Sequence, residues 1–204
     1  MARGWLMLAG MLAGAGAALA AGAAALADEP FAKPAGAAPL FDSQGYRIAR
    51  YRAPVEADPA PAARIALADA LALEPGRDAL FIDVMPAEGG VRDAATGAWR
   101  LAQPHSTIAG AEWHPEAGRM PADPALWQAL ESAARRAAPE RPVILLCRID
   151  CWMSWNAARR LAASGLTNVF WLAEGTDGWH GAGRALVTAV PVAVVPSPDD
   201  NTEN

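Results

Sequence analysis

The sequence predicts an α/β fold built on a mostly parallel sheet. Short, continuous apolar runs, typical of buried strands, recur along the chain. Segments with the spacing of an amphipathic helix lie between them. The resulting order is strand, helix, strand, helix, strand, with short connections around the last two strands, which is the pattern of an α/β protein.

The first elements are expected before residue 114. Residues 45–52 alternate enough to suggest a strand, and residues 58–74 have an aspartate N-cap and a Pro-Gly stop that indicate a helix. Residues 79–84 form an apolar run that ends in an acid, as expected of a buried parallel strand. Residues 85–107 are rich in turn formers and predict a long loop, and residues 108–113 predict a short strand.

The second half gives the clearer pattern. A helix is expected to begin at Asp123-Pro124 and to end before Pro139, because its apolar residues fall on one face. Residues 142–147 predict a second buried strand. Residues 154–164 predict a helix with a glycine at its C-terminal stop, and residues 168–172 predict a third core strand.

Residues 1–27 have the layout of a secretory signal peptide. They hold 21 apolar side chains, five glycines and one charge, Arg3, and they end in a small-x-small site at Ala25–Ala27. A second such site lies at Ala18–Ala20, and an uncleaved membrane anchor is disfavoured because alanine partitions poorly into lipid. We therefore expect export to the periplasm and no membrane association after cleavage.

The rest of the chain divides into three parts. Residues 28–45 predict a flexible leader, residues 46–185 the folded domain, and residues 186–204 a C-terminal tail. The apolar run at 185–195 is too short to span a bilayer. The net charge is −5, and no basic patch is present, so a nucleic-acid partner is disfavoured.

The two cysteines, Cys147 and Cys151, are the only ones in the chain. Cys147 ends a predicted strand, and a helix is expected from about Ser154, so the intervening loop lies where ligands bind in open α/β sheets. Inward-facing N–H groups of this loop and the neighbouring Arg148 would favour a nucleophilic thiolate on Cys147. The alternative is that Cys147 is a small buried apolar residue.

Several motifs resemble the rhodanese homology domain over residues 77–183. In order along the chain they are Ile82-Asp-Val84, Thr107-Ile-Ala-Gly-Ala111, Leu146-Cys-Arg148, Leu161-Ala-Ala-Ser-Gly-Leu-Thr-Asn-Val169 and Glu174-Gly-Thr-Asp-Gly-Trp179. The stretch Asp150–Ala157, together with the last of these, is similar to the PQQ-dependent catabolism-associated CXXCW-motif proteins. The resemblance implies an open five-stranded sheet with helices on both faces and a periplasmic role beside quinoprotein dehydrogenases.

The resemblance also implies roles for individual residues. Cys147 would be the nucleophile that forms a persulfide, Arg148 an anion-binding residue, and Asp83 a residue near the loop at the end of the neighbouring strand. The other candidates for substrate binding all belong to the loop: Ile149, Asp150, Trp152, Met153 and Ser154.

The chain departs from the family pattern at three positions. Thr107 stands where a histidine is common, and Met85 stands where an arginine is frequent. The loop is one residue longer than in common rhodaneses and so resembles that of dual-specificity phosphatases. Phosphatase chemistry is nevertheless disfavoured, because Met153 occupies the position of the arginine that would clamp a phosphate.

Cys151 leaves two interpretations open. It could resolve a persulfide or sulfenate on Cys147, with a disulfide as the resting form, or the pair could be a purely structural bridge. Trp152 and Trp155 could wall a pocket, form a partner surface or pack in the core. Neither a metal nor a cofactor is expected, since the three histidines lack ligand-like spacing.

Two functional hypotheses follow. The first is an exported sulfurtransferase or thiol redox protein that acts on a small sulfur donor or acceptor, or on a periplasmic redox protein, through Cys147 and Cys151. The alternative is a non-catalytic accessory protein of a quinoprotein dehydrogenase or its cytochrome c partner, with a structural Cys147–Cys151 disulfide.

Overall fold

Five parallel strands form the central sheet of the computed structural model, which describes residues 38–195. Across the sheet they run in the order β1 (Ala63–Arg64), β8 (Val169–Trp171), β7 (Val143–Leu146), β2 (Leu80–Asp83) and β6 (Glu112–Trp113). Every neighbouring pair is parallel. The predicted α/β class and the five-stranded parallel sheet are therefore confirmed.

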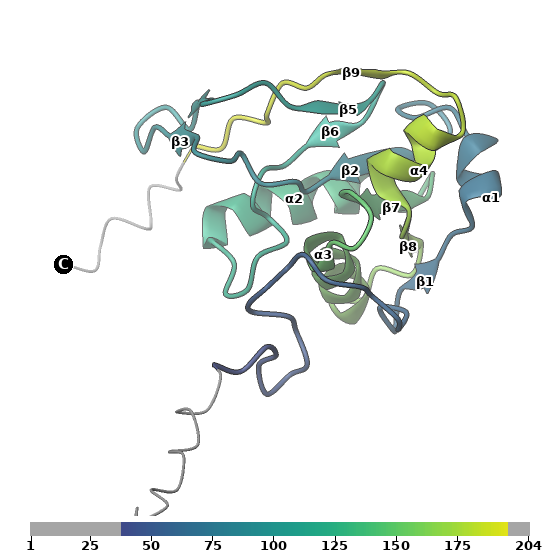
Figure 1. Ribbon diagram of the computed structural model, residues 1–204, viewed down its shortest axis with the longest axis horizontal. Helices are drawn as coiled ribbons and strands as arrows, with labels where there is room; N and C mark the ends of the chain where they lie inside the picture. The colour runs from purple at the N-terminus through teal and green to yellow at the C-terminus, as the bar shows by residue number, and fades with distance from the viewer. Residues whose placement is uncertain (1–37, 196–204) are drawn as a thin grey trace, which may run out of the picture. The chain divides into compact units, whose positions relative to one another are not determined.

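Helices cover both faces of this sheet (Figure 1). Alternate residues of a strand point to opposite faces, so β2 sends Leu80 and Ile82 toward α2 (Pro124–Ala137) and α3 (Trp152–Ala163). Phe81 points the other way, toward α1 (Leu67–Leu71) and α4 (Gly175–Gly181). All four residues of β2 and of β7 are buried, which explains their continuous apolar runs.

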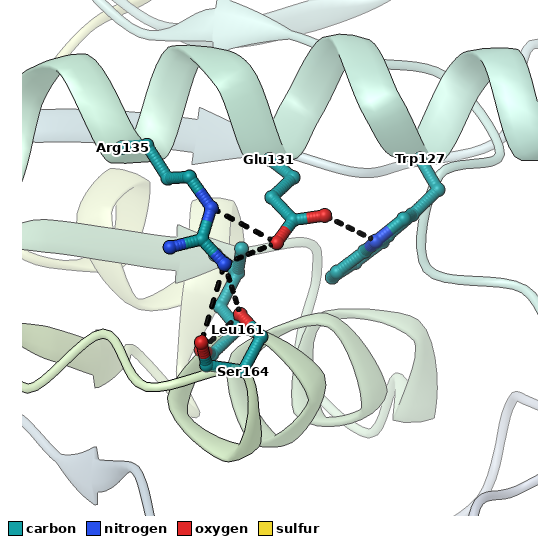
Figure 2. Close-up of polar contacts among 5 residues, drawn as sticks. All are labelled: Trp127, Glu131, Arg135, Leu161 and Ser164. Carbon is teal, nitrogen blue, oxygen red and sulfur yellow. Dashed lines mark hydrogen bonds and ion pairs between the residues drawn. The ribbon is translucent and has the colours of Figure 1, made fainter.

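The two larger helices, α2 and α3, are tied together at the surface (Figure 2). The Glu131 carboxylate accepts hydrogen bonds from Trp127 Nε1 at 3.0 Å and from Arg135, and Arg135 also donates to the backbone and hydroxyl oxygens of Ser164 after α3. Burial tends to raise the pKa of Glu131, but these hydrogen bonds and the charge of Arg135 lower it overall.

Four short strands form two antiparallel pairs beside the sheet. β3 (Val91–Arg92) pairs with β4 (Trp99–Arg100), and β5 (Ser106–Ile108) pairs with β9 (Leu186–Thr188). β9 and the buried Val194 belong to the segment that the sequence assigns to a C-terminal tail. Within residues 38–195, no helix has the length and apolar character needed to cross a membrane.

Two of the early elements were predicted wrongly. Residues 45–52 form no strand of the sheet, because they make only isolated bridges, Phe41 to Arg47 and Arg52 to Cys151. The expected helix over 58–74 is replaced by β1 and the short α1. Proline at position 61 disfavours a helical conformation in the residue before it, and pairing with β8 draws residues 63–64 into the sheet.

Smaller corrections concern loops and boundaries. The loop predicted over 85–107 contains the β3–β4 hairpin, whose turn is held by the Asp93 carboxylate accepting two backbone N–H groups. Residues 108–113 hold the end of β5 and all of β6 rather than one strand. Helix α4 was not expected, because its three glycines are poor helix formers; Trp179 anchors it by packing on Phe81 at 5.9 Å.

Candidate functional site

The two cysteines are joined to each other by a disulfide. The S–S distance is 2.06 Å and the Cα atoms of Cys147 and Cys151 are 6.3 Å apart. Cys147 directly follows β7, and Cys151 is the N-cap of α3, so the helix begins two residues earlier than predicted and only three residues lie between the cysteines. Both residues are buried, with Cys147 0% and Cys151 3% exposed.

One side of the disulfide loop is held by the start of α4. The N–H of Thr176 donates to the Cys147 carbonyl at 2.9 Å, and the N–H of Ile149 donates to the Asp177 carboxylate at 2.8 Å. Arg148 forms an antiparallel bridge with Gly175. The sharp change of direction in the loop falls at Asp150, which has a φ of 56°.

The segment around residues 51–53 holds the other side. The N–H of Ala53 donates to the Asp150 carbonyl at 3.0 Å, and the N–H of Trp152 donates to the Tyr51 carbonyl at 2.9 Å. Arg52 Nη1 adds a bond to the Ile149 carbonyl at 2.8 Å. Two segments distant in sequence therefore hold the loop. The segment at 51–53 precedes it by about 100 residues, and Asp177 follows Ile149 by 28 residues.

This clamping corrects the predicted arrangement of the loop amides. The sequence predicted that the N–H groups turn inward to surround the Cys147 sulfur. Those of Ile149 and Trp152 instead donate to a carboxylate and a carbonyl of the neighbouring segments. A backbone N–H pairs with a strong acceptor within reach, and the sequence did not show that Asp177 and Tyr51 would supply one.

A cavity of about 310 Å³ lies beside the disulfide. It is lined by Arg50, Tyr51, Arg52, Met85, Pro86, Glu88, Arg119, Arg148, Cys151 and Met153. The lining residues that follow β2 and β7 place it beyond the carboxyl ends of these strands, where α/β sheets bind ligands. Its four arginines face a single glutamate in a chain of net charge −5, so the cavity is a local concentration of positive charge.

The structure brings together only some of the residues predicted to form the site. Arg148, Cys151 and Met153 line this cavity, whereas Ile149 and Asp150 line a separate cavity of about 180 Å³ with Glu174 and Arg64, among others. Cys147 lines neither of them. The loop therefore separates two pockets instead of forming the floor of one.

The helical part of the predicted site is packed in the core. Trp152 and Trp155 are 8% and 4% exposed, with ring centroids 5.2 Å apart, and Trp152 also packs edge-on against Phe41 at 5.2 Å. The hydroxyl of Ser154 donates to the Cys151 carbonyl at 3.3 Å and accepts from Trp171 Nε1 at 3.0 Å. The core-packing interpretation of the two tryptophans is the one that the structure supports.

Asp83 lies at the end of β2, but its carboxylate is used for structure. It is fully buried and accepts from the N–H of Met85 at 2.8 Å and from the Thr107 hydroxyl at 2.7 Å. The second carboxylate oxygen also lies 2.7 Å from His105 Nε2. These bonds tie β5 to the end of β2, and Asp83 does not line the arginine-rich cavity.

The sequence did not predict three of the cavity arginines, Arg50, Arg52 and Arg119, as site residues. A signal was present, because three arginines occur within residues 47–52 of an acidic chain. The expectation of a strand there obscured it. Arg119 lies over the Tyr51 ring at 5.4 Å. The Tyr51 hydroxyl donates a hydrogen bond to the Met120 carbonyl and accepts one from the Met120 N–H.

The described residues contain no cluster of three or more histidine, cysteine or acidic side chains that could hold a metal ion. The side chains that converge on the arginine-rich cavity instead provide guanidinium groups, thioether and aromatic surface, and a disulfide sulfur. Guanidinium groups bind oxyanions through paired hydrogen bonds. The arrangement is therefore suited to holding a small anion next to a group capable of thiol–disulfide exchange.

Comparison with known proteins gives structural likeness at low identity. Neither a protein-family model nor a curated protein matches the chain. The chain is similar to a thiosulfate sulfurtransferase from Pseudomonas aeruginosa, with 21% identity over 69% of this chain and a TM-score of 0.45; the match spans 23% of that protein. It is also similar to the polysulfide-sulfur transferase homodimer from Wolinella succinogenes, with 18% identity and a TM-score of 0.42. That match covers 63% of this chain and 80% of the other.

Proposed function

We propose that the chain transfers sulfane sulfur, with the Cys147–Cys151 pair as its reactive group. The observation that carries the proposal is a disulfide placed beside an arginine-lined cavity at the carboxyl edge of the sheet. Sulfane sulfur donors such as thiosulfate are anions, and arginine is the side chain best suited to binding them. In the proposed cycle the pair passes between dithiol and disulfide, and closing of the disulfide releases the sulfur.

The proposed cycle balances as follows. In the dithiol form, the Cys147 thiolate attacks the outer sulfur of thiosulfate, the S–S bond of the donor breaks, and sulfite leaves with the electron pair. The Cys151 thiolate then attacks the inner sulfur of the Cys147 persulfide, and hydrosulfide leaves as the Cys147–Cys151 disulfide closes. An external thiol supplies the two electrons that return the pair to the dithiol.

The test is sulfur transfer by the reduced protein and its cysteine variants. With thiosulfate and excess thiol, we expect continuous release of sulfite and hydrosulfide. Cys151→Ser should take up one sulfur on Cys147 and release no hydrosulfide without added thiol, whereas Cys147→Ser should take up none. Full sulfur transfer by Cys147→Ser would end the proposal.

A second candidate is a non-catalytic accessory role, and one observation favours it. The loop between the cysteines is hydrogen-bonded on both sides, and both cysteines are buried, as expected of a structural bridge. Under this proposal the chain would assist a periplasmic quinoprotein dehydrogenase or its cytochrome c. The resemblance to CXXCW-motif proteins is its support; the predicted signal peptide, residues 1–27, lies outside the described residues.

Counting thiols distinguishes the two candidates. The native protein should contain no reactive thiol, because its two cysteines are paired. If mild reductant releases a thiol that is alkylated rapidly near neutral pH, sulfur transfer is supported. A bridge that withstands this treatment in the folded protein supports the accessory role.

A further inference from the structure

The two sulfur-bearing residues of the disulfide differ in their access to the arginine-rich cavity. Cys151 lines the cavity and is 3% exposed. Cys147 is 0% exposed, follows a fully buried strand and does not line it. Which sulfur of a disulfide is attacked depends on access, so a molecule held in this cavity meets Cys151 first.

The positive charge of the cavity favours an anionic ligand. Four arginines and one glutamate, Glu88, line it, which gives a formal charge of +3. Arg52 donates to the Ile149 carbonyl, and Arg119 is paired with Glu116. The guanidinium groups of Arg50 and Arg148 donate to no acceptor within residues 38–195, so their hydrogen bonds remain for a ligand.

The local structure around Cys151 also favours negative charge on that residue. Cys151 is the N-cap of α3, a helix of 12 residues, and its side chain makes no capping hydrogen bond. The N–H of Trp152 is taken by the Tyr51 carbonyl, so what the first turn presents is its remaining N–H groups and the positive end of the helix dipole. An anionic group carried on Cys151 would therefore be stabilised from two sides, by α3 and by the arginines.

We propose that this cavity binds a sulfite-class oxyanion and that the bound anion opens the disulfide at Cys151. The lone pair on the sulfur of sulfite attacks Cys151 Sγ and forms a new S–S bond, while the Cys147–Cys151 bond breaks. Its electron pair leaves on Cys147 as a thiolate. The sulfite dianion and the disulfide thus give an S-sulfonate on Cys151 and a thiolate on Cys147, each with one negative charge, and no other reactant is needed.

The inference rests on the proposed function, because it adds a second route, besides direct attack by the external thiol, by which the closed disulfide releases the Cys147 thiolate. The external thiol then displaces sulfite from the Cys151 S-sulfonate, which returns Cys151 to the cycle. It assigns to Cys151 a role as the substrate-facing sulfur in the oxidised protein. It also assigns the arginines to a small sulfur oxyanion that the same cycle produces. Thiosulfate, the donor in the proposed cycle, reacts with the dithiol form, whereas sulfite reacts with the disulfide form.

The test treats the oxidised, full-length protein with sulfite and alkylates the thiol that is released. Trypsin cleaves after Arg148, between the two cysteines, so Cys147 and Cys151 fall in the separate peptides 137–148 and 149–159. We expect the sulfonate on the Cys151 peptide and the alkyl group on the Cys147 peptide. A sulfonate found on Cys147, a mixture of both, or no reaction would overturn the inference.

The role of charge is tested with a pair of matched variants. Arg50→Gln removes one cavity arginine and should slow opening by sulfite about five- to tenfold, but should change opening by a neutral thiol less than about twofold. Arg77→Gln removes the same charge before β2, at the amino edge of the sheet, and should change neither rate by more than about twofold. An equal loss for both reagents, or an unchanged sulfite rate in Arg50→Gln, would overturn the assignment of the arginines.

Failure of the inference is distinguishable from failure of the proposed function. Sulfite treatment uses the disulfide form and no sulfane donor, whereas sulfur transfer is measured on the dithiol form. Sulfonation at Cys151 without thiosulfate turnover would refute sulfur transfer alone. Turnover with sulfonation at Cys147 would refute the inference alone.

Discussion

Gly175 offers the sharpest test of how tightly the disulfide loop is held. This residue begins α4 at a φ of 54° and bridges to Arg148. A Cβ placed on it would lie well inside van der Waals contact with the carbonyl oxygen of Cys147 and 3.0 Å from the Arg148 Cα. Both neighbours are backbone atoms of the loop, so neither can rotate away.

Two costs add for Gly175→Ala. A positive φ costs an L-residue about 1–2 kcal/mol. Overpacking a tight backbone contact adds about 1–3 kcal/mol, because α4 must move away from the end of β7. We expect the free energy of unfolding to fall by about 2–5 kcal/mol, which lowers the Tm of a domain of this size by roughly 4–20 °C.

Two further glycines separate the two costs. Gly165 has a φ of 95° and nothing within 4 Å of its Cβ position, so Gly165→Ala should show only the conformational cost, about 1–2 kcal/mol. Gly181, at the end of the same helix as Gly175, has no positive φ and nothing within 4 Å; Gly181→Ala should be neutral or stabilise by up to about 1 kcal/mol.

The assay is urea unfolding followed by circular dichroism, with the disulfide intact in every variant. If Gly175→Ala proves no less stable than Gly165→Ala, the contact of the new alanine Cβ with the Cys147 carbonyl does not destabilise the fold. The loop would then be loosely held, and α4 would not position the disulfide.

Three other perturbations follow from the structure. Reducing the Cys147–Cys151 disulfide should lower the free energy of unfolding by about 2 kcal/mol. The effect is small because the disulfide closes a short loop and so restricts the unfolded chain only a little; denaturant unfolding with and without reductant measures it. Asp123→Ala should cost about 1–2 kcal/mol in the same assay, because its carboxylate caps the first turn of α2. The hydrogen bond from His114 lowers the pKa of Glu112, partly opposed by burial, so Glu112 stabilises the fold above its unfolded pKa of about 4.5 and this contribution is lost as the pH falls through the lower folded pKa. Glu112→Gln should therefore cost less than about 1 kcal/mol near neutral pH, with the difference from wild type vanishing in acid.

Each of these has its own control. Asp123→Asn retains a capping acceptor but loses the ion pair with Arg92, so it should cost less than half as much as Asp123→Ala. Glu56→Gln changes an exposed carboxylate with no hydrogen-bond partner among residues 38–195, and it should leave the acid side of the stability profile unchanged. A disulfide whose reduction left the stability unchanged, equal costs for both Asp123 variants, or a Glu112 effect that grew in acid would contradict the respective argument.

The core of the fold was predictable because its signals are local. The runs that become β2, β7 and β8 are continuous and apolar, and the Asp-Pro start of α2 appears in the structure as an N-cap with a carboxylate bonded to two backbone N–H groups. The start of the domain was not predictable in this way. Residues 63–64 pair with β8, more than 100 positions later, and no local pattern shows such a partner.

The candidate site likewise has features that local sequence predicts and features that depend on distant segments. The position of Cys147 at the end of a strand followed from the apolar run before it, and that part of the prediction is confirmed. The cavity was not predicted, since its lining comes from the segment at 50–52, from residues after β2 and from Arg119, which only the tertiary structure brings together. The direction of the loop amides likewise depended on acceptors from distant segments, Tyr51 and Asp177.

Trp152 directly follows the disulfide in the chain and packs against Trp155 and Phe41. Disulfides quench the emission of nearby indole rings by accepting an electron from the excited state, and thiols quench it less. Opening the disulfide should therefore raise the tryptophan fluorescence, so that the oxidation state of the pair could be followed in real time, without a label, during sulfur transfer and sulfite treatment.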